Sequence, residues 1–526
     1  MKILTRPVLA VPLAGLLASL ALPPIHLFPF LFFLSVPAAM LLKASRKRSA
    51  FLIGWGMGLG WFVVSLYWTS YALVTGGSAF YWMIPFAVLL LPAGLALFWG
   101  LAFLLAWLCF SSPASRLAGC CFWLMGMEWL RGHILTGFPW QTPGMSFAFA
   151  PIGFDLASIL GVYGCGVVAI LIGLLPLMLY QRQHLGGFIL PVSAAIIITM
   201  AMAAAALVSG RPLEDTAATG LRIRMVQPSI PQKDKWIRAL RAEHIEKHIA
   251  LSLMDQNLTH QGSADPDAPD APDTQNAPDV IIWGEVSYAG MLEQDLPKWD
   301  EAFRAASQMK SWLILGSLYR QDHPTGLVYY NSAFLMQPDA SISGRYDKQF
   351  LVPWGEFVPL RHIFSFVDKL VGGVDFSNGT GPVLLSLDRE DGRLVRIAPL
   401  ICYEIIYPAS TRQASDNADL IVNLTNDAWF GNSLGPRQHL AMARMRSAEL
   451  GLPMVRVATT GISAVIDPYG RLVTHIGYDV SGWRDAVIKG RTQTLYSRWG
   501  ESGFVFLLIV ILGLSFLSRP RHNTMG

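Results

Sequence analysis

The chain has 526 residues, of which 53% are hydrophobic and only 14% are charged, and its mean hydropathy is +0.41. This composition is too apolar for an ordinary soluble protein of that length. The net charge of +4 comes without a basic stripe interleaved with aromatic residues, which argues against nucleic acid as a partner.

Apolar residues concentrate in the first 208 positions and again near the C-terminus. Crossing the hydrocarbon of a bilayer takes roughly 20 residues, so these runs predict membrane helices, although four of them are short. The first run lacks a small-residue cleavage site, which argues against a signal peptide. The predicted spans are residues 8–22, 27–42, 51–73, 80–108, 117–130, 157–180, 188–208 and 503–517.

Basic residues predict the orientation of these spans. They follow alternate connections, and the positive-inside rule places those connections in the cytoplasm. Residues 209–500 therefore face outward, which means the periplasm of a bacterium whose inner membrane holds the chain. Arg131 is the chief exception, in a Pro-, Gly- and Trp-rich stretch that we expect to be re-entrant or interfacial. The basic residues on the cytoplasmic side are Lys2, Arg6, Lys43, Arg46, Lys47, Arg48, Arg116, Arg182, Arg519 and Arg521.

The predicted organisation is a membrane domain (1–208), a layered α/β domain (209–500) and a last membrane helix with a cytoplasmic tail (501–526). Strand and helix patterns alternate through the middle part, which favours packed layers of sheet and helix. Residues 260–279 repeat Asp-Ala-Pro and predict a solvated loop. Strands are expected at 221–226, 280–283, 312–318, 332–336, 341–346, 395–401, 420–424, 454–458, 463–466 and 471–475, and helices at 235–253, 299–309 and 437–450.

Three residues of the middle part offer the chemistry of acyl transfer. Cys402 follows the apolar run 395–401, Glu285 ends the run 280–285, and Lys348 follows a further short strand. Only a thiolate attacks effectively, so Glu285 is the candidate base. Lys348 can stabilise the thiolate and the oxyanion, with the backbone N–H of Tyr403 as a second donor. Each charged residue taken alone is more often a surface ion-pair partner, and it is the combination that predicts catalysis.

The remaining cysteines favour the same nucleophile. Cys109, Cys120, Cys121 and Cys165 lie in or beside predicted membrane spans, where small apolar packing is their default role. Cys402 has no partner in its own domain, although an unpaired thiol is a liability in an oxidising compartment. There are no grouped His and Cys ligands, so neither a metal nor a diffusible cofactor is expected.

The middle part resembles the nitrilase superfamily, which uses a Glu-Lys-Cys triad in an αββα sandwich, and the whole chain resembles the apolipoprotein N-acyltransferase family. It departs from the family pattern at Gly284, where Pro is usual, and at Val286-Ser287, where Ser-Ala is usual. The motifs that carry the resemblance are Ile230-Pro231-Gln232 with Lys235-Trp236, Ile282-Trp283-Gly284-Glu285, Tyr329-Tyr330-Asn331-Ser332, the segment from Tyr346 and Lys348 to Pro359, Ile401-Cys402-Tyr403-Glu404, and Asn426 to Gly431.

The resemblance implies further site residues. Glu356 would orient Lys348 or the reacting amine, and Tyr403 and Glu404 would support the nucleophile, with plain packing as their alternative. Trp236, Asn331, Trp354 and Phe357 would contact substrate. An apolar segment that could dip into lipid as a lid, or else form covered core, comprises Trp354, Phe357, Ile363, Phe364, Phe366, Val367, Leu370 and Val371.

These features predict a ping-pong acyltransferase. A phospholipid, with phosphatidylethanolamine expected, would acylate Cys402, and the N-terminal amine of a diacylated apolipoprotein would then take the acyl chain at the bilayer. One alternative is a membrane-anchored amidase or nitrilase that hydrolyses a small amide, although seven preceding spans exceed what an anchor needs. The other is a non-catalytic lipid-binding or scaffold protein, which would leave the triad without a role.

Overall fold

The computed structural model describes residues 7–75, 77–180, 212–254, 277–306, 310–324, 326–359 and 375–517. The chain divides into two compact units. The first comprises residues 1–211, 433–445 and 493–526, and the second comprises residues 212–432 and 446–492.

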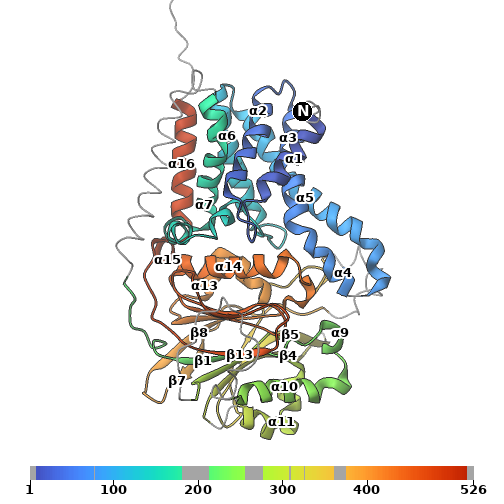
Figure 1. Cartoon of the computed structure of the whole chain (residues 1–526), viewed down its shortest axis with the longest axis vertical. Helices are drawn as coiled ribbons and strands as arrows, with labels where there is room; N and C mark the ends of the chain where they lie inside the picture. Colours follow the sequence, from blue (N-terminus) through green and yellow to red (C-terminus); the bar gives the residue numbers. More distant parts are fainter. Residues whose placement is uncertain are drawn as a thin grey trace, which may run out of the picture. The chain divides into compact units, whose positions relative to one another are not determined.

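The first unit is helical (Figure 1). Its helices α1 and α3 approach very closely, because a Cβ added at Gly15 would lie 2.0 Å from the carbonyl oxygen of Met57. Small residues of this kind let helix backbones pack together in membranes. The described elements are α1 (Pro7–Ser19), η1 (Phe28–Leu34), α2 (Ser35–Leu42), α3 (Lys47–Leu66), η2 (Tyr67–Ser70), α4 (Tyr71–Thr75), η3 (Ser78–Met83), α5 (Ile84–Cys109), α6 (Pro113–Arg131), η4 (Pro143–Phe147), α7 (Pro151–Tyr180), α15 (Leu495–Trp499) and α16 (Ser502–Leu517).

The membrane prediction is supported in part. Three helical segments are long and apolar enough to cross a bilayer, namely Lys47–Thr75, Phe80–Cys109 and Pro151–Tyr180. The predicted spans 8–22, 27–42 and 503–517 contain shorter apolar helices, and 117–130 lies in α6, which carries charged residues. The predicted span 188–208 lies outside the described residues. A membrane protein is therefore supported, whereas the count of eight spans is not confirmed.

The exceptional Arg131 lies inside the first unit. Its guanidinium forms an ion pair of 2.7 Å with Glu128, and both side chains are buried. Glu128 also accepts a hydrogen bond of 2.7 Å from the indole of Trp99. The Pro-, Gly- and Trp-rich stretch that follows is largely buried, with Trp140 fully covered. Because each buried charge has a partner, the pair can be accommodated in an apolar unit.

The second unit contains two sheets. One has the order β13-β1-β2-β4-β5-β6, with β3 also paired to β4, and the other has the order β12-β11-β10-β9-β8-β7. The strands are β1 (Arg222–Gln227), β2 (Val280–Trp283), β3 (Tyr288–Met291), β4 (Trp312–His323), β5 (Gly326–Met336), β6 (Ile342–Asp347), β7 (Leu385–Asp388), β8 (Leu394–Ile401), β9 (Leu420–Thr425), β10 (Met454–Ala458), β11 (Ser463–Ile466), β12 (Leu472–Ile476) and β13 (Gly482–Val487).

The two sheets pack face to face and form an αββα sandwich (Figure 1). Ile282 of β2 and Val422 of β9 belong to the core between the sheets, whereas Ile281 faces a second core beneath helices α10 and α11. This alternation follows from the period of two along a strand. The helices of this unit are α9 (Gln232–Lys235), η5 (Arg238–Leu240), α10 (Arg241–Leu253), α11 (Leu292–Ala306), η8 (Cys402–Ile406), α13 (Pro408–Ala414) and η9 (Asp427–Phe430), and α14 (Leu434–Leu450) contributes its last residues.

Some predicted elements differ from the structure for physical reasons. The single helix expected at 235–253 is interrupted, because Trp236 leaves the helical conformation after α9 and α10 begins only at Arg241. Strands β3, β7 and β13 were not predicted. In β13 the buried residues include Asp485, which pairs with Arg224 at 2.7 Å. A buried charged pair hides the apolar alternation on which strand prediction relies. Most of the Asp-Ala-Pro stretch lies outside the described residues.

Candidate active site

Cys402 lies directly after β8, at the start of the short helix η8. Its backbone is left-handed, with a φ of +51°. This conformation is unfavourable for a residue with a Cβ, and it turns the thiol away from the line of the strand. The residue is 7% exposed, so the sulfur lies in a nearly closed site.

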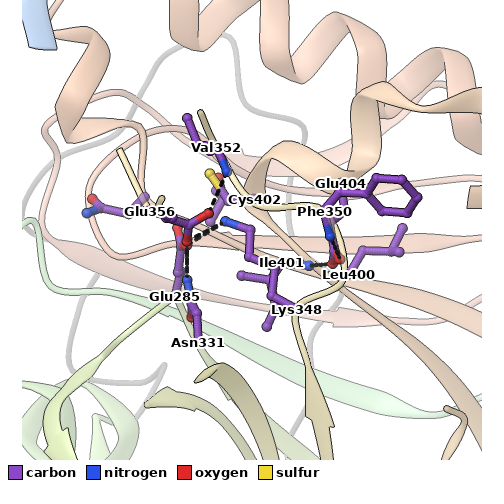
Figure 2. A network of polar contacts seen from close by, with 12 residues as sticks. Glu285, Asn331, Lys348, Phe350, Val352, Glu356, Leu400, Ile401, Cys402 and Glu404 are labelled. Atoms are coloured by element: carbon purple, nitrogen blue, oxygen red, sulfur yellow. Dashed lines mark hydrogen bonds and ion pairs between the residues drawn. The ribbon is translucent and has the colours of Figure 1, made fainter. Parts of the chain in front are cut away.

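Glu404 holds this turn together (Figure 2). One carboxylate oxygen accepts a hydrogen bond of 2.7 Å from the backbone N–H of Ile401, the residue before Cys402. The other accepts from the hydroxyl of Tyr346 at 2.8 Å and from the backbone N–H of Gln349 at 2.7 Å. Glu404 thus joins the turn at Cys402 to the segment that carries Lys348, and its pKa is raised by burial.

Glu285 follows β2, which is parallel to β1 and β4. Its backbone N–H donates to the carbonyl of Thr425 at the end of β9, over 3.3 Å. The next residue, Val286, is left-handed with a φ of +43°. The carboxylate accepts a hydrogen bond of 2.8 Å from the side-chain amide of Asn331. Strand ends of the two sheets therefore bring Glu285 and Cys402 to one place.

Lys348 follows β6 and is 1% exposed. Its ammonium lies 2.9 Å from the carboxylate of Glu356 and 3.5 Å from that of Glu285 (Figure 2). Glu356 is fixed in a turn, because its second oxygen accepts from the backbone N–H of Val352 at 2.8 Å. The amide of Asn331 also donates to Glu356 at 2.9 Å and so links the two carboxylates.

Burial and neighbouring charges shift the pKa values of both Cys402 and Lys348. Burial and the carboxylate of Glu285 raise the pKa of the Cys402 thiol to about 12, although Lys348 and a hydrogen bond with Thr425 lower it. Burial opposes the charge of Lys348, but Glu356 and Glu285 outweigh it and raise the pKa of that ammonium above its ordinary value. The resting site therefore holds a neutral thiol beside a charged lysine.

The structure adds buried polar residues that the sequence did not single out. The ammonium of Lys235 donates to the carbonyl oxygen of Glu285 over 2.9 Å. Arg456 forms a fully buried ion pair of 2.8 Å with Asp427, whose charge acts on Cys402. Lys235 and Asp427 lie within motifs that carry the family resemblance, so those motifs could have identified them as site residues. Arg456 lies in a strand, where apolar patterning gives no indication of it.

Three of the four expected substrate-contacting residues are more exposed. Trp236 is 50% exposed, Trp354 is 48% exposed and Phe357 is half-buried, whereas Asn331 and the expected supporting residue Tyr403 are buried. The rest of the expected lid, Ile363 to Val371, lies outside the described residues. Within the part of the chain that the structure describes, no group of three or more His, Cys, Asp or Glu side chains suits a metal ion.

The αββα fold and the site with its thiol, lysine and carboxylates define an enzyme of the carbon-nitrogen hydrolase class, and the model of the carbon-nitrogen hydrolase family matches residues 222–493. The model of the apolipoprotein N-acyltransferase N-terminal domain matches residues 14–175. The chain is 35% identical to the apolipoprotein N-acyltransferase of Rhizobium rhizogenes over 98% of its length and 97% of that relative. It is 36% identical to the one of Bradyrhizobium diazoefficiens over 97% of its length and 95% of the relative. The chain belongs to the apolipoprotein N-acyltransferase family.

Solved structures are more distantly similar to this chain. The carbon-nitrogen hydrolase from Helicobacter pylori G27 is 16% identical, with a TM-score of 0.35, and the match covers 55% of this chain and 95% of that one. Nit3 of Saccharomyces cerevisiae, a member of the nitrilase superfamily, is 15% identical with a TM-score of 0.36, over 55% of this chain and 96% of that one.

Proposed function

We propose that the protein transfers an acyl chain from a phospholipid to the N-terminal amine of an S-diacylglyceryl-cysteine lipoprotein, through a thioester on Cys402. The observation that carries this proposal is the buried contact of Lys348 with two carboxylates beside a left-handed cysteine, in a chain of the N-acyltransferase family. Such a site can form, hold and discharge an acyl-enzyme.

In the first half-reaction Glu285 accepts the proton of Cys402, and the sulfur attacks the ester carbonyl carbon of the phospholipid. Lys348 stabilises the resulting oxyanion, and one such donor is typically worth about 10²–10³ in rate. The carbon–oxygen bond then breaks, and Glu285 returns the proton to the leaving glyceryl oxygen. A lysophospholipid departs, and the acyl chain remains on the sulfur.

In the second half-reaction the lipoprotein amine attacks the thioester carbon. Glu285 accepts a proton from the nitrogen, the carbon–sulfur bond breaks, and Cys402 regains the proton as the amide forms. Glu356 lies closer to Lys348 than Glu285 does, at 2.9 Å against 3.5 Å. This difference supports Glu356 as the fixed partner of Lys348, which leaves Glu285 available to exchange protons.

Asn331 is proposed to contact the incoming amine. Its amide nitrogen donates to the carboxylates of Glu285 and Glu356, which fixes the orientation of the side chain. Its carbonyl oxygen is buried and accepts no hydrogen bond from the described residues. An amine that approaches Cys402 would satisfy this acceptor, whereas a buried acceptor left without a partner is costly.

The part of the chain outside the catalytic domain supports lipid substrates. The membrane helices and the match to the apolipoprotein N-acyltransferase N-terminal domain support a site that draws its acyl donor from a bilayer. The alternate basic connections support an inner-membrane location with the catalytic domain in the periplasm. Trp236, Trp354 and Phe357 are proposed to receive the lipid, and Tyr403 to donate its backbone N–H to the oxyanion.

The proposal is tested by incubating the purified full chain with phosphatidylethanolamine labelled in its acyl chain and with a synthetic diacylated lipopeptide. Transfer of label to the lipopeptide N-terminus is expected from the wild type and not from Cys402→Ser. Hydrolysis of added small amides without transfer would favour the amidase alternative, and neither reaction would favour a non-catalytic role.

A further inference from the structure

Lys235 is a buried lysine that the reaction scheme above does not use. It ends α9 and is 4% exposed, although the next residue, Trp236, is half-exposed. Its ammonium donates to a carbonyl oxygen, that of Glu285, over 2.9 Å. The hydroxyl of Thr459 donates to the same oxygen over 2.7 Å. Two side chains thus fix the peptide group of the proposed catalytic base.

The conformation of the peptide group after Glu285 depends on such contacts. Val286, which follows it, has an unfavourable left-handed backbone. A Cβ added at Gly284 would lie 2.3 Å from the backbone nitrogen of Thr459, so the chain also passes close to another strand end. The position of the Glu285 carboxylate therefore depends on contacts made by its own backbone. Lys235 makes one of these contacts with a charged group, which strengthens the hydrogen bond.

The charge balance of the buried site also supports a role for Lys235. Glu285 and Glu356 bring two negative charges, Glu404 is a third buried carboxyl group, and Lys348, which contacts Glu285 and Glu356, brings one positive charge. The pair Asp427–Arg456 is balanced within itself. Without Lys235 the buried site would carry an excess negative charge, and an excess charge is costly away from water. The charges of both Glu285 and Cys402 act on Lys235.

We propose that Lys235 is a positioning residue of the active site: it holds the Glu285 peptide in place and supplies the second positive charge that favours the Cys402 thiolate. This inference rests on the proposed function in one respect only, namely that the Cys402 thiolate is the nucleophile of acyl transfer. When the proton moves from Cys402 to Glu285, the negative charge moves to the sulfur, and both lysines then attract it.

The charge on Lys235 should be lost at moderately high pH. Burial lowers the pKa of Lys235 to about 8, although Glu285 and Cys402 oppose this shift. Lys235 also acts on His244 and His248 of α10, and the other charges that act on those histidines include Asp234, Glu243 and Lys247. Burial lowers the pKa of His248 to about 3 and that of His244 below its usual 6.5, so neither histidine changes charge near pH 8.

The test measures the rate at which iodoacetamide alkylates Cys402 from pH 6 to 10, with the adduct on Cys402 quantified by mass spectrometry. Lys235→Met removes the charge and a donor, Thr459→Val removes only a donor, and Lys235→Arg keeps both. Below pH 8, where Lys235 is charged, alkylation should be about tenfold slower or more in Lys235→Met, because one unit charge near a buried thiol shifts its pKa by about one unit. The rate should stay within about twofold of the wild type in the other two variants.

An alkylation rate in Lys235→Met equal to that of the wild type below pH 8 would overturn the proposal, as would an equal fall in the rate of Thr459→Val. If Lys235→Met does not fold, the pH profile of the wild type is compared with that of Lys235→Arg instead. Acylation by a short water-soluble activated ester should then decline above pH 8 in the wild type and persist in Lys235→Arg, and identical profiles would overturn the proposal. Slower alkylation in Lys235→Met, together with no lipoprotein acylation by the wild type, would retain the role of Lys235 and reject the proposed function.

Discussion

The backbone at Cys402 is strained, and the surrounding residues hold it in that conformation. A left-handed conformation at a residue other than glycine costs about 1–3 kcal/mol and persists only where neighbouring contacts impose it. Glu404 supplies such contacts, because it accepts hydrogen bonds from the backbone of Ile401, just before Cys402, and of Gln349, just after Lys348. Its geometry supports a bracing role within the site.

Replacing Glu404 with Gln is expected to disturb these hydrogen bonds, although the two side chains have nearly the same shape. The carboxylate accepts from at least three donors, and an amide NH₂ would face at least one of them. Losing a hydrogen bond to a buried charged group typically costs about 1.5–3 kcal/mol. A matching fall in the free energy of unfolding is expected, together with slower alkylation of Cys402. Unchanged stability and unchanged alkylation would show that Glu404 does not brace the turn.

At the scale of elements, the site lies where strands of two sheets end. Strand β2 delivers Glu285, β8 delivers Cys402, and the end of β6 delivers Lys348. The sequence predicts this much for Glu285 and Cys402, which follow apolar runs, whereas Lys348 follows a short and mostly polar strand. It does not predict Lys235 against Glu285 or Arg456 against Asp427, since such pairs depend on how separate strands meet in space.

The close approach of β4 to the segment after β2 is open to a direct test. A Cβ at Gly316 would lie 2.4 Å from the backbone nitrogen of Val286 and 2.8 Å from the Cα of Glu285. Gly316→Ala should therefore displace Glu285 and cost about 1–3 kcal/mol of stability through overpacking. Acylation of Cys402 should slow at least tenfold. Gly482→Ala is the matched control, because open space surrounds its added Cβ. Normal acylation in Gly316→Ala would contradict this placement of Glu285.

The turn that carries Glu356 also presents the proposed lipid contacts Trp354 and Phe357. Phe357→Asp should hinder acylation by phospholipid, because a carboxylate is costly among acyl chains. Reaction with a short, water-soluble activated ester should remain near normal, and Phe357→Leu should resemble the wild type. If Phe357→Asp slows both acyl donors equally, Phe357 is core and the lid proposal is wrong.

At the scale of the whole molecule, an α/β enzyme unit is built into a chain with membrane helices. Composition and apolar runs predict both parts, and the two sheets and three long apolar helices agree with that prediction. The number of spans could not be predicted as well. Several apolar runs are shorter than a bilayer crossing, and the charged residues Glu128 and Arg131, which pair with each other three positions apart on α6, are buried inside the helical unit.

The proposed topology predicts the access of thiol reagents from each side of the membrane. In a Cys109→Ala background, a cysteine at exposed Lys310 should react with a membrane-impermeant maleimide applied from the periplasm. A cysteine at exposed Arg48 should react only after the membrane is permeabilised. The reverse pattern would place the catalytic unit in the cytoplasm and remove lipoproteins with periplasmic N-termini as its substrates.

The account depends most on an acyl thioester at Cys402. Mass spectrometry of the full chain incubated with phosphatidylethanolamine alone should find one fatty acyl group on Cys402, and adding diacylated lipopeptide should discharge it to the lipopeptide amine. Glu285→Gln should show no adduct, because the thiol whose pKa is raised to about 12 would lack its base. An acyl group on any other residue, or transfer to the lipopeptide without acylation of Cys402, would contradict the account.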